Sequence, residues 1–374
     1  MSVEIRRVET KRDLRKFINF PFKVFKGNSC WIPPFYQDEL NTLAKDRNPA
    51  FEFSEAEYWL AYKDGEAVGR IAALINHRYI EKWGNKYGRF GWLDFVEDFE
   101  VAEALVKTAE DWLRSKGMVG IQGPLGFTDV DKEGLLIEGF NELGTMPMIY
   151  NHPYYPEYLE RLGYKKDVDW LEYEVKVPKE IPEKVVRVQK LISERTGLHV
   201  YDWKSTRELK ARFGKPIFAL IDEAYAHLYG TTPLSERQVE AYIKQYLGFA
   251  DPRFLKIVVN REGKLVAFGI SIPSLSRALQ KSKGRILPFG WIPLLHALRR
   301  PKGIDMLLIA MDPKEQSLGA VAFLMTSIIK SCQEAGVVSA ETSGELETNH
   351  DIQLLWKDYE RRQHKRRRAY LKML

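Results

Sequence analysis

The chain has 374 residues, with 57 lysines and arginines against 51 aspartates and glutamates, which gives a formal net charge of +6. A hydrophobic fraction of 45% is enough to bury packed cores and excludes an intrinsically disordered protein, and the length suggests two domains. Cys30 and Cys332 are too few for a disulfide framework or a cysteine-rich zinc site, and no metal is predicted.

No apolar stretch follows the first residues, so the sequence predicts no signal peptide. A membrane-spanning helix needs about 18 consecutive apolar residues, and no run reaches that length. The most apolar stretch, residues 286–298, is shorter and contains Pro288 and Pro293. These features predict a soluble, cytoplasmic protein.

A β-hairpin pattern occurs twice in the chain. Residues 58–75 contain β-rich sequence on both sides of an acidic turn at Gly65, and residues 254–270 repeat this arrangement around Gly263. Sequence of this kind around an acidic residue and glycine is typical of an antiparallel hairpin.

Each hairpin is followed by the same succession of a strand, an amphipathic helix that ends at a glycine, and a further strand. In the first half these elements are expected at 90–96, 101–113 and 118–122, and in the second half at 304–311, 319–334 and 337–340. Matching successions indicate a duplicated fold, in which residues 276–303 form an insertion in the second copy.

A domain boundary is predicted where Pro178 and Pro182 lie among charged residues. We therefore expect an N-terminal domain at 1–178 and a C-terminal domain at 179–374. A helix at 183–196 would open the second domain.

The strand-to-helix turn of the second half, residues 312–324, has the sequence DPKEQSLGAVAFL. It resembles the acyl-CoA-binding turn of the GNAT (GCN5-related N-acetyltransferase) superfamily, whose pattern is Gln/Arg-x-x-Gly-x-Gly/Ala. Gln316 and Gly319 match this pattern, whereas Val321 replaces the second small residue. Residues 151–166 of the first half resemble the final GNAT helix with its leucine–glycine–aromatic ending.

The resemblance implies an α/β (α+β) protein with two tandem GNAT-like acyl-CoA N-acyltransferase domains, each a mixed, mostly antiparallel sheet flanked by helices. It also implies acetyl-CoA or a longer acyl-CoA as co-substrate, with its pyrophosphate at a helix N-terminus. The residues implied at this site are Met311, Gln316, Ser317, Leu318, Gly319, Ala320 and Val321. The corresponding segment of the first half, residues 97–100, is acidic and would repel phosphate, so the first domain is expected to bind no CoA.

Acyl transfer to an amine requires a general base, a donor that polarises the thioester carbonyl and an acid for the leaving thiolate. By resemblance, backbone N–H groups near the end of the 304–311 strand would polarise the carbonyl. Glu341 is the first candidate base because it ends a strand, ahead of Glu345 and Glu347, and His350 is a substitute. A solvated acidic loop would give the same pattern.

The usual thiolate acid of the superfamily is a tyrosine seven residues after an asparagine like Asn349. This chain has Trp356 at that position, which cannot donate such a proton. Tyr359, one helical turn further on, is the candidate acid, and ordinary packing is its alternative role.

Two segments raise the question of partners. Residues 361–368 carry six positive charges, which a solvated terminal strand, the CoA phosphates, an anionic membrane surface or nucleic acid would explain. Nucleic acid is the least favoured because no RNA-binding aromatic motif accompanies the charges. The insertion at 276–303 has an apolar centre with basic flanks, which is typical of a lid or a membrane-surface segment and equally of packing between domains.

The leading hypothesis is an acyl-CoA-dependent N-acyltransferase whose acceptor is a small-molecule or lipid-like amine. One alternative is a Fem-type peptidyl transferase that uses aminoacyl-tRNA. The other is a catalytically silent acyl-CoA or lipid-binding protein.

Overall fold

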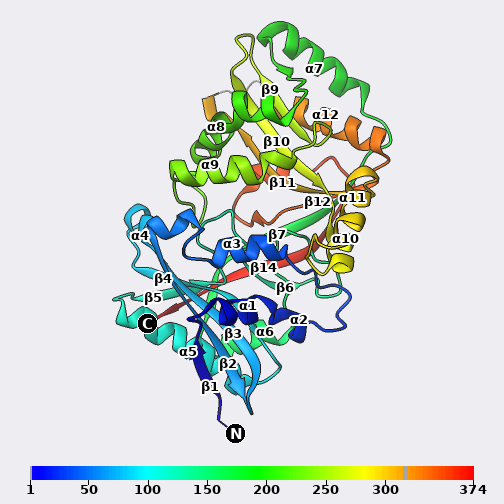
Figure 1. Ribbon diagram of the computed structural model, residues 1–374. Coiled ribbons are helices and arrows are strands. Elements are labelled where there is room, and N and C mark those ends of the chain that lie inside the picture. Colours follow the sequence, from blue (N-terminus) through cyan, green and yellow to red (C-terminus); the bar gives the residue numbers. More distant parts are fainter. Residues whose placement is uncertain (1, 315–318) are drawn as a thin grey trace.

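The computed structural model describes residues 2–314 and 319–374. Within them, fourteen strands form one mixed sheet that runs through both halves of the molecule (Figure 1). The strands are β1 (Glu4–Arg7), β2 (Ser54–Lys63), β3 (Glu66–Asn76), β4 (Tyr87–Phe95), β5 (Gly120–Gly123), β6 (Leu135–Glu138), β7 (Lys165–Lys176), β8 (His199–Val200), β9 (Leu255–Val259), β10 (Leu265–Pro273), β11 (Gly303–Met311), β12 (Ser339–Thr342), β13 (Glu345–Leu346) and β14 (Arg361–Met373).

Helices flank the sheet on both faces. They are α1 (Lys11–Asn19), α2 (Pro21–Val24), α3 (Tyr36–Leu43), α4 (His77–Trp83), α5 (Phe99–Ser115), α6 (Tyr154–Arg161), α7 (Glu183–Thr196), α8 (Thr206–Tyr225), α9 (Glu236–Gln245), α10 (Ser276–Ser282), α11 (Trp291–Arg299), α12 (Ala320–Ala335) and α13 (His350–Leu354), with short 3-10 turns at Pro49–Glu52 and Leu247–Phe249. Among these described helices, none combines the length and apolar character needed to traverse a bilayer.

Both predicted hairpins are confirmed. β2 and β3 pair across Asp64 and Gly65, which both have positive φ, as the tight turn between two twisted strands requires. β9 and β10 pair in the same way across a turn at Gly263. The predicted elements that follow are also present: β4, α5 and β5 in the first half, and β11, α12 and β12 in the second.

Each half has a core on both faces of its part of the sheet. In the first half, side chains of alternating residues along β3 pack toward α5 on one face and toward α1 and α3 on the other. In the second half, α12 covers one face, and α8 with α9 covers the other. The amphipathic face predicted for α5 is buried, since Val101, Leu105, Ala109 and Leu113 are inaccessible to solvent.

A β-bulge occurs at the same place in each half. In β11, Met306 pairs with Ser271 and Leu308 pairs with Ile270, so Leu307 is the extra residue. In β4, Trp92 has a positive φ of 45° beside the corresponding irregularity. The repeated bulge supports the duplication inferred from the hairpins.

The last strands of the two halves are exchanged. The sheet order is β1-β2-β3-β4-β5-β14-β7-β12-β11-β10-β9-β8, so β14 pairs with β5 of the first half and β7 pairs with β12 of the second. In Figure 1, the red C-terminal strand accordingly lies among the strands of the first half. The predicted domain boundary falls between β7 and α7, and it stays a prediction because the sheet is continuous across the two halves.

The basic segment 361–368 lies in β14, in the interior of the sheet, and its interpretation as a solvated terminal strand is wrong. Lys365 and Arg367 are each only 1% exposed. Every lysine and arginine from Arg362 to Arg368 meets a carboxylate; the ion pairs are Arg362 with Glu142 and Glu174, Lys365 with Glu341, Arg366 with Asp169 and Glu347, Arg367 with Glu172, and Arg368 with Asp169 and Glu160. These charges are therefore neutralised within the fold.

Because this network is buried, alanine substitution of two arginines in β14 should lower the free energy of unfolding by unequal amounts. Arg367→Ala removes a buried partner of Glu172 and should lower the free energy of unfolding by about 3 kcal/mol. Arg361→Ala, at an exposed position of β14, should lower the free energy of unfolding by less than about 1 kcal/mol. Urea unfolding of both variants measures the difference, and equal effects would contradict a buried network at the centre of the sheet.

Candidate active site between the two halves

A cavity of about 560 Å³ lies between the two halves. Apolar and aromatic side chains make up most of its lining, and they come from both halves of the chain. The second half contributes β10, β11, α8 and α12, and the first half contributes α3, the β4 bulge and the loop that precedes β6. A cavity of this size and character is typical of a small-molecule site, because such sites enclose about 300–1,000 Å³ and are largely apolar.

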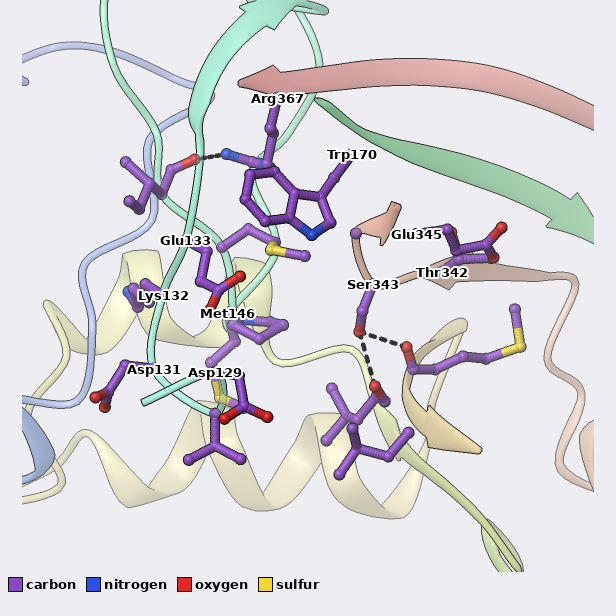
Figure 2. Close-up of a pocket in the computed structure, with 18 of the residues that line it drawn as sticks. Asp129, Asp131, Lys132, Glu133, Met146, Trp170, Thr342, Ser343, Glu345 and Arg367 are labelled. Carbon is purple, nitrogen blue, oxygen red and sulfur yellow. Dashed lines mark hydrogen bonds between the residues drawn. The ribbon is translucent and has the colours of Figure 1, made fainter. Parts of the chain in front are cut away.

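One wall of the cavity is the place where two parallel strands diverge. β11 and β12 pair only as far as Met306 and Thr342, and the Leu307 bulge follows directly. Ser343 holds the divergence point, since its Oγ donates hydrogen bonds to the carbonyl oxygens of Met306 (2.7 Å) and Leu307 (3.2 Å), drawn dashed in Figure 2. Beyond this point, the residues from Leu307 to Ile309 line the cavity.

The predicted CoA-binding turn is described in part. Gln316, Ser317 and Leu318 lie outside the described residues. Gly319 caps α12 with a left-handed φ of 74°, and a Cβ there would come within 2.7 Å of Ile192 on α7. The glycine is therefore required by the backbone conformation as well as by close packing.

Three other predicted CoA-binding residues lie on either side of this turn. Met311 ends β11 and packs in the same apolar cluster as the buried Ala320. Val321, where the sequence departs from the GNAT pattern, is half-buried in the first turn of α12.

The equivalent turn of the first half is occupied by a carboxylate of the chain itself. Asp98 caps α5 by accepting hydrogen bonds from the backbone N–H groups of Glu100 and Val101. Lys63 pairs with Asp98 at 2.5 Å and with Glu100 at 3.0 Å. The donors at this helix N-terminus therefore already have an anionic partner, and the absence of CoA from the first half stays a prediction.

The three predicted catalytic residues lie outside the set of described residues that line the cavity. Glu341 pairs with Lys365 (2.9 Å) on the other side of β12. His350 is exposed at the start of α13, and Tyr359 packs against Trp356 with 6.4 Å between the ring centroids. The catalytic roles of these three residues stay predictions.

Glu345, the second of the three glutamates considered, does line the cavity. It is 8% exposed, and its Oε1 accepts a hydrogen bond of 2.6 Å from Nε1 of Trp356. Burial raises the pKa of Glu345 to about 7, although the hydrogen bond from Trp356 acts in the opposite direction. Trp356, which replaces the expected tyrosine, therefore orients a carboxyl group that can carry a proton at neutral pH.

A second group of ionisable residues faces the cavity from the first half, in the loop that precedes β6. Asp129, Asp131, Lys132 and Glu133 all contribute to the lining (Figure 2). Burial raises the pKa of Asp129 and of Glu133, the latter strongly, and it raises that of Asp131 to about 6. Burial also lowers the pKa of Lys132.

Of these four residues, Asp131 has a structural role. Its Oδ2 accepts hydrogen bonds from the backbone N–H groups of Phe127 (2.8 Å) and Thr128 (3.1 Å), which fixes the loop. Of the carboxyl groups in this loop, Asp129 and Glu133 are the two without this role, and burial raises the pKa of both. Neither residue was predicted from the sequence, although three acidic residues and a lysine within 129–133 were a visible signal.

Metal binding receives no support from the described part of the chain, where no group of three or more His, Cys, Asp or Glu side chains could hold an ion.

The chain is similar over most of its length to two bacterial proteins. It is 27% identical to Protein YghO of Escherichia coli (strain K12) across 99% of this chain and 95% of that protein. It is 28% identical to the bacterial ceramide synthase of Caulobacter vibrioides (strain NA1000 / CB15N) across 78% of this chain and 75% of that protein. No protein-family model matches the sequence.

Among solved structures, the tandem GNAT protein from the clavulanic acid biosynthesis pathway superposes with a TM-score of 0.57 at 12% identity. The superposition covers 100% of this chain and 98% of that one. This likeness confirms the predicted fold, two GNAT-like units in tandem.

A buried carboxyl group behind the cavity predicts a pH-dependent stability. Asp305 on β11 is 2% exposed and pairs in register with Glu341 on β12. Burial, and then the charge of Glu341, raise the pKa of Asp305 to about 7 from 3.8. Between these two values the folded chain keeps a proton that the unfolded chain releases, so this carboxyl makes the folded state less stable as the pH rises from about 4 to 7.

Asp305→Asn should therefore stabilise the protein at pH 8 by roughly 2 to 4 kcal/mol and should have little effect at pH 4. Thermal or urea unfolding at the two pH values measures the effect. A gain that is equal at both would show that ionisation of Asp305 does not limit the stability.

Proposed function

We propose that this protein is an N-acyltransferase that moves an acyl group from a CoA thioester to an amine. The observation that carries the proposal is the divergence of β11 and β12 at the Leu307 bulge, which opens onto a cavity with buried carboxyl groups on two sides. Fold similarity supports the same reaction class, because the structural relative is a tandem GNAT protein.

The donor would lie on the side of the second half. The gap between the diverging strands would hold the extended thioester arm, and α12 and α13 add the apolar side chains of Leu324, Met325, Ile328 and Ile352 to the lining of the cavity. The backbone N–H groups in the first turn of α12, which begins after Gly319, would bind the pyrophosphate. The described residues of this half thus fit an acyl-CoA.

Three groups of the chain would share the chemistry. Glu133 or Asp129 would accept a proton from the amine, whose nitrogen then forms a bond to the thioester carbon. Backbone N–H groups at the Leu307 bulge would stabilise the negative charge on the carbonyl oxygen. The C–S bond then breaks, and Glu345 would give its proton to the departing thiolate.

These roles follow from position as well as from the pKa values. Glu345 lies on the donor side, beside the residue that replaces the tyrosine expected as the acid, and its pKa of about 7 keeps it partly protonated at neutral pH. Asp129 and Glu133 come from the other half of the chain and line the same cavity. The active site would therefore be incomplete in either half alone.

The acceptor is proposed to be a long-chain or otherwise lipid-like amine. The largely apolar lining of the cavity suits a hydrocarbon chain better than a polar metabolite. The relative named bacterial ceramide synthase supports the same class of substrate. The alternative of an aminoacyl-tRNA-dependent peptidyl transferase loses its main support, because the lysines and arginines from Arg362 to Arg368 are paired with carboxylates of the chain itself.

Binding of the donor is tested by thermal shift with CoA, acetyl-CoA and palmitoyl-CoA. We expect palmitoyl-CoA to raise the Tm the most, since it binds only the folded state and fills the apolar cavity. Gly319→Glu should abolish the shift by placing a negative charge at the pyrophosphate position.

The matched control for this experiment is Gly336→Glu. Gly336 also has a left-handed φ, at the opposite end of α12, and a Cβ there meets nothing within 4 Å. This variant should keep the shift. Equal responses of the two variants would mean that CoA does not bind at the start of α12.

Removing the acid should change both the rate and its pH profile. Release of free CoA thiol by the wild-type protein should fall as the pH rises above about 7, because Glu345 then loses the proton it must donate. Glu345→Gln should lower kcat by about 100-fold or more and should abolish this pH limb.

Glu341→Gln serves as the comparison, because Glu341 belongs to the ion network behind the cavity. It should keep kcat within about threefold of wild type, as expected for a residue that does not touch substrate. If Glu341→Gln is instead the inactive variant, Glu341 is the base, as its position at a strand end predicts. Binding of acyl-CoA without thiol release, with any long-chain amine, would support a non-catalytic binding protein.

A further inference from the structure

The insertion at 276–303 forms a helical hairpin, α10 and α11, with an inner and an outer face. Its inner face is buried, since Leu275, Leu279 and Leu294 pack with Ile32 of the first half. The predicted packing between domains is thus present. In Figure 1, the hairpin lies at the periphery, on the side of the molecule opposite α8 and α9.

The outer face and the connection between the two helices expose large apolar side chains. Leu287 is 77% exposed and Phe289 is 73% exposed. Ile286, Trp291 and Ile292 are each about half exposed. We call these five residues the apolar tip. A contiguous apolar surface of this kind on a folded protein marks an interaction site.

Basic residues flank the apolar tip on both sides in the sequence. Residues 274–304 contain no aspartate or glutamate but seven lysines and arginines: Arg277, Lys281, Lys283, Arg285, Arg299, Arg300 and Lys302. All seven side chains are exposed, and within the described parts of the chain no carboxylate lies at ion-pair distance from any of them. They differ in this respect from the basic residues of β14, which are neutralised inside the sheet.

We propose that the apolar tip and its flanking basic residues dock the protein on an anionic lipid bilayer. Exposed leucine, isoleucine, phenylalanine and tryptophan side chains can enter the boundary between headgroups and acyl chains, and the flanking cations then meet lipid phosphates. A second copy of the chain fits this surface less well, because a symmetric contact would bring seven unpaired cations against seven others.

This docking surface goes beyond the proposed function and does not rest on it. The exposed apolar and basic residues are present whether or not the protein transfers acyl groups. The two are nevertheless connected in space. Ile32, Phe35 and Met146 line the cavity and also belong to the apolar cluster under the hairpin. A docked hairpin would therefore hold this end of the cavity close to the bilayer, where amphiphilic substrates reside.

The test is flotation of the full-length protein with vesicles. We expect binding to vesicles of phosphatidylcholine with about a third phosphatidylglycerol, and binding at least about tenfold weaker to phosphatidylcholine alone. Leu287→Ser/Phe289→Ser and, separately, Arg299→Glu/Arg300→Glu should each weaken binding to the anionic vesicles by about tenfold or more. Added salt should weaken binding of the wild-type protein.

The matched control is Arg207→Glu/Lys215→Glu, which makes the same change of charge at exposed positions of α8, on the other side of the molecule. It should reduce binding by less than about threefold. Unchanged Tm values will show that the variants fold, as expected for substitutions at exposed positions.

Three results would overturn the proposal: no preference for anionic vesicles, an equal loss of binding in the α8 control, or a self-association without lipid that Leu287→Ser/Phe289→Ser abolishes. The experiment is independent of acyltransfer. Failure of vesicle binding would leave the CoA thermal shift untouched, and absence of that shift would leave the docking surface untouched.

Discussion

β7 and β14 pair along most of their length at the centre of the sheet, and each strand is also hydrogen-bonded to a strand of the opposite half. Buried ion pairs, such as that of Arg367 with Glu172, fix the register of this pairing, since either charge alone would be costly in the interior. The two halves consequently cannot separate without breaking the sheet. Because the shared sheet holds the two halves together, each half forms one wall of the cavity between them.

The same constraint explains how carboxyl groups distant in sequence come to share one cavity. Glu345 follows the short strand β12, and Glu133 precedes β6, which itself pairs with β14. Both are desolvated by the apolar lining, so their pKa values are raised. Duplication followed by divergence makes the two halves different at their helix N-termini. In the first half Asp98 caps the N-terminus of α5, whereas in the second half Gly319 precedes α12.

The basic residues of this protein have two different environments in the folded chain. In β14, the closely spaced basic side chains contact carboxylates supplied by neighbouring segments of the chain. The resulting ion pairs stabilise the fold. The basic residues around α10 and α11 have no such neighbours in the described structure and remain available to an external anion. Composition alone does not distinguish the two cases, because the difference lies in which strands and helices are adjacent.

Turn residues and hydrophobic periodicity act over short distances, and for that reason they were sufficient to predict the hairpins, the succession of strand, helix and strand in each half, and the duplication. The GNAT-like fold was predicted from the resemblance of residues 312–324 and 151–166 to that superfamily. The acidic residues at the end of β12 and after it also predicted three candidates for the general base, Glu341, Glu345 and Glu347, and of these Glu345 lines the cavity. Their pattern did not separate Glu345 from Glu341, because the turn at Ser343 decides which side chain enters the cavity. The exchange of β7 and β14, and the approach of Asp129 and Glu133 to the second half, could be seen only in the folded molecule, since they depend on pairing between segments some 200 residues apart.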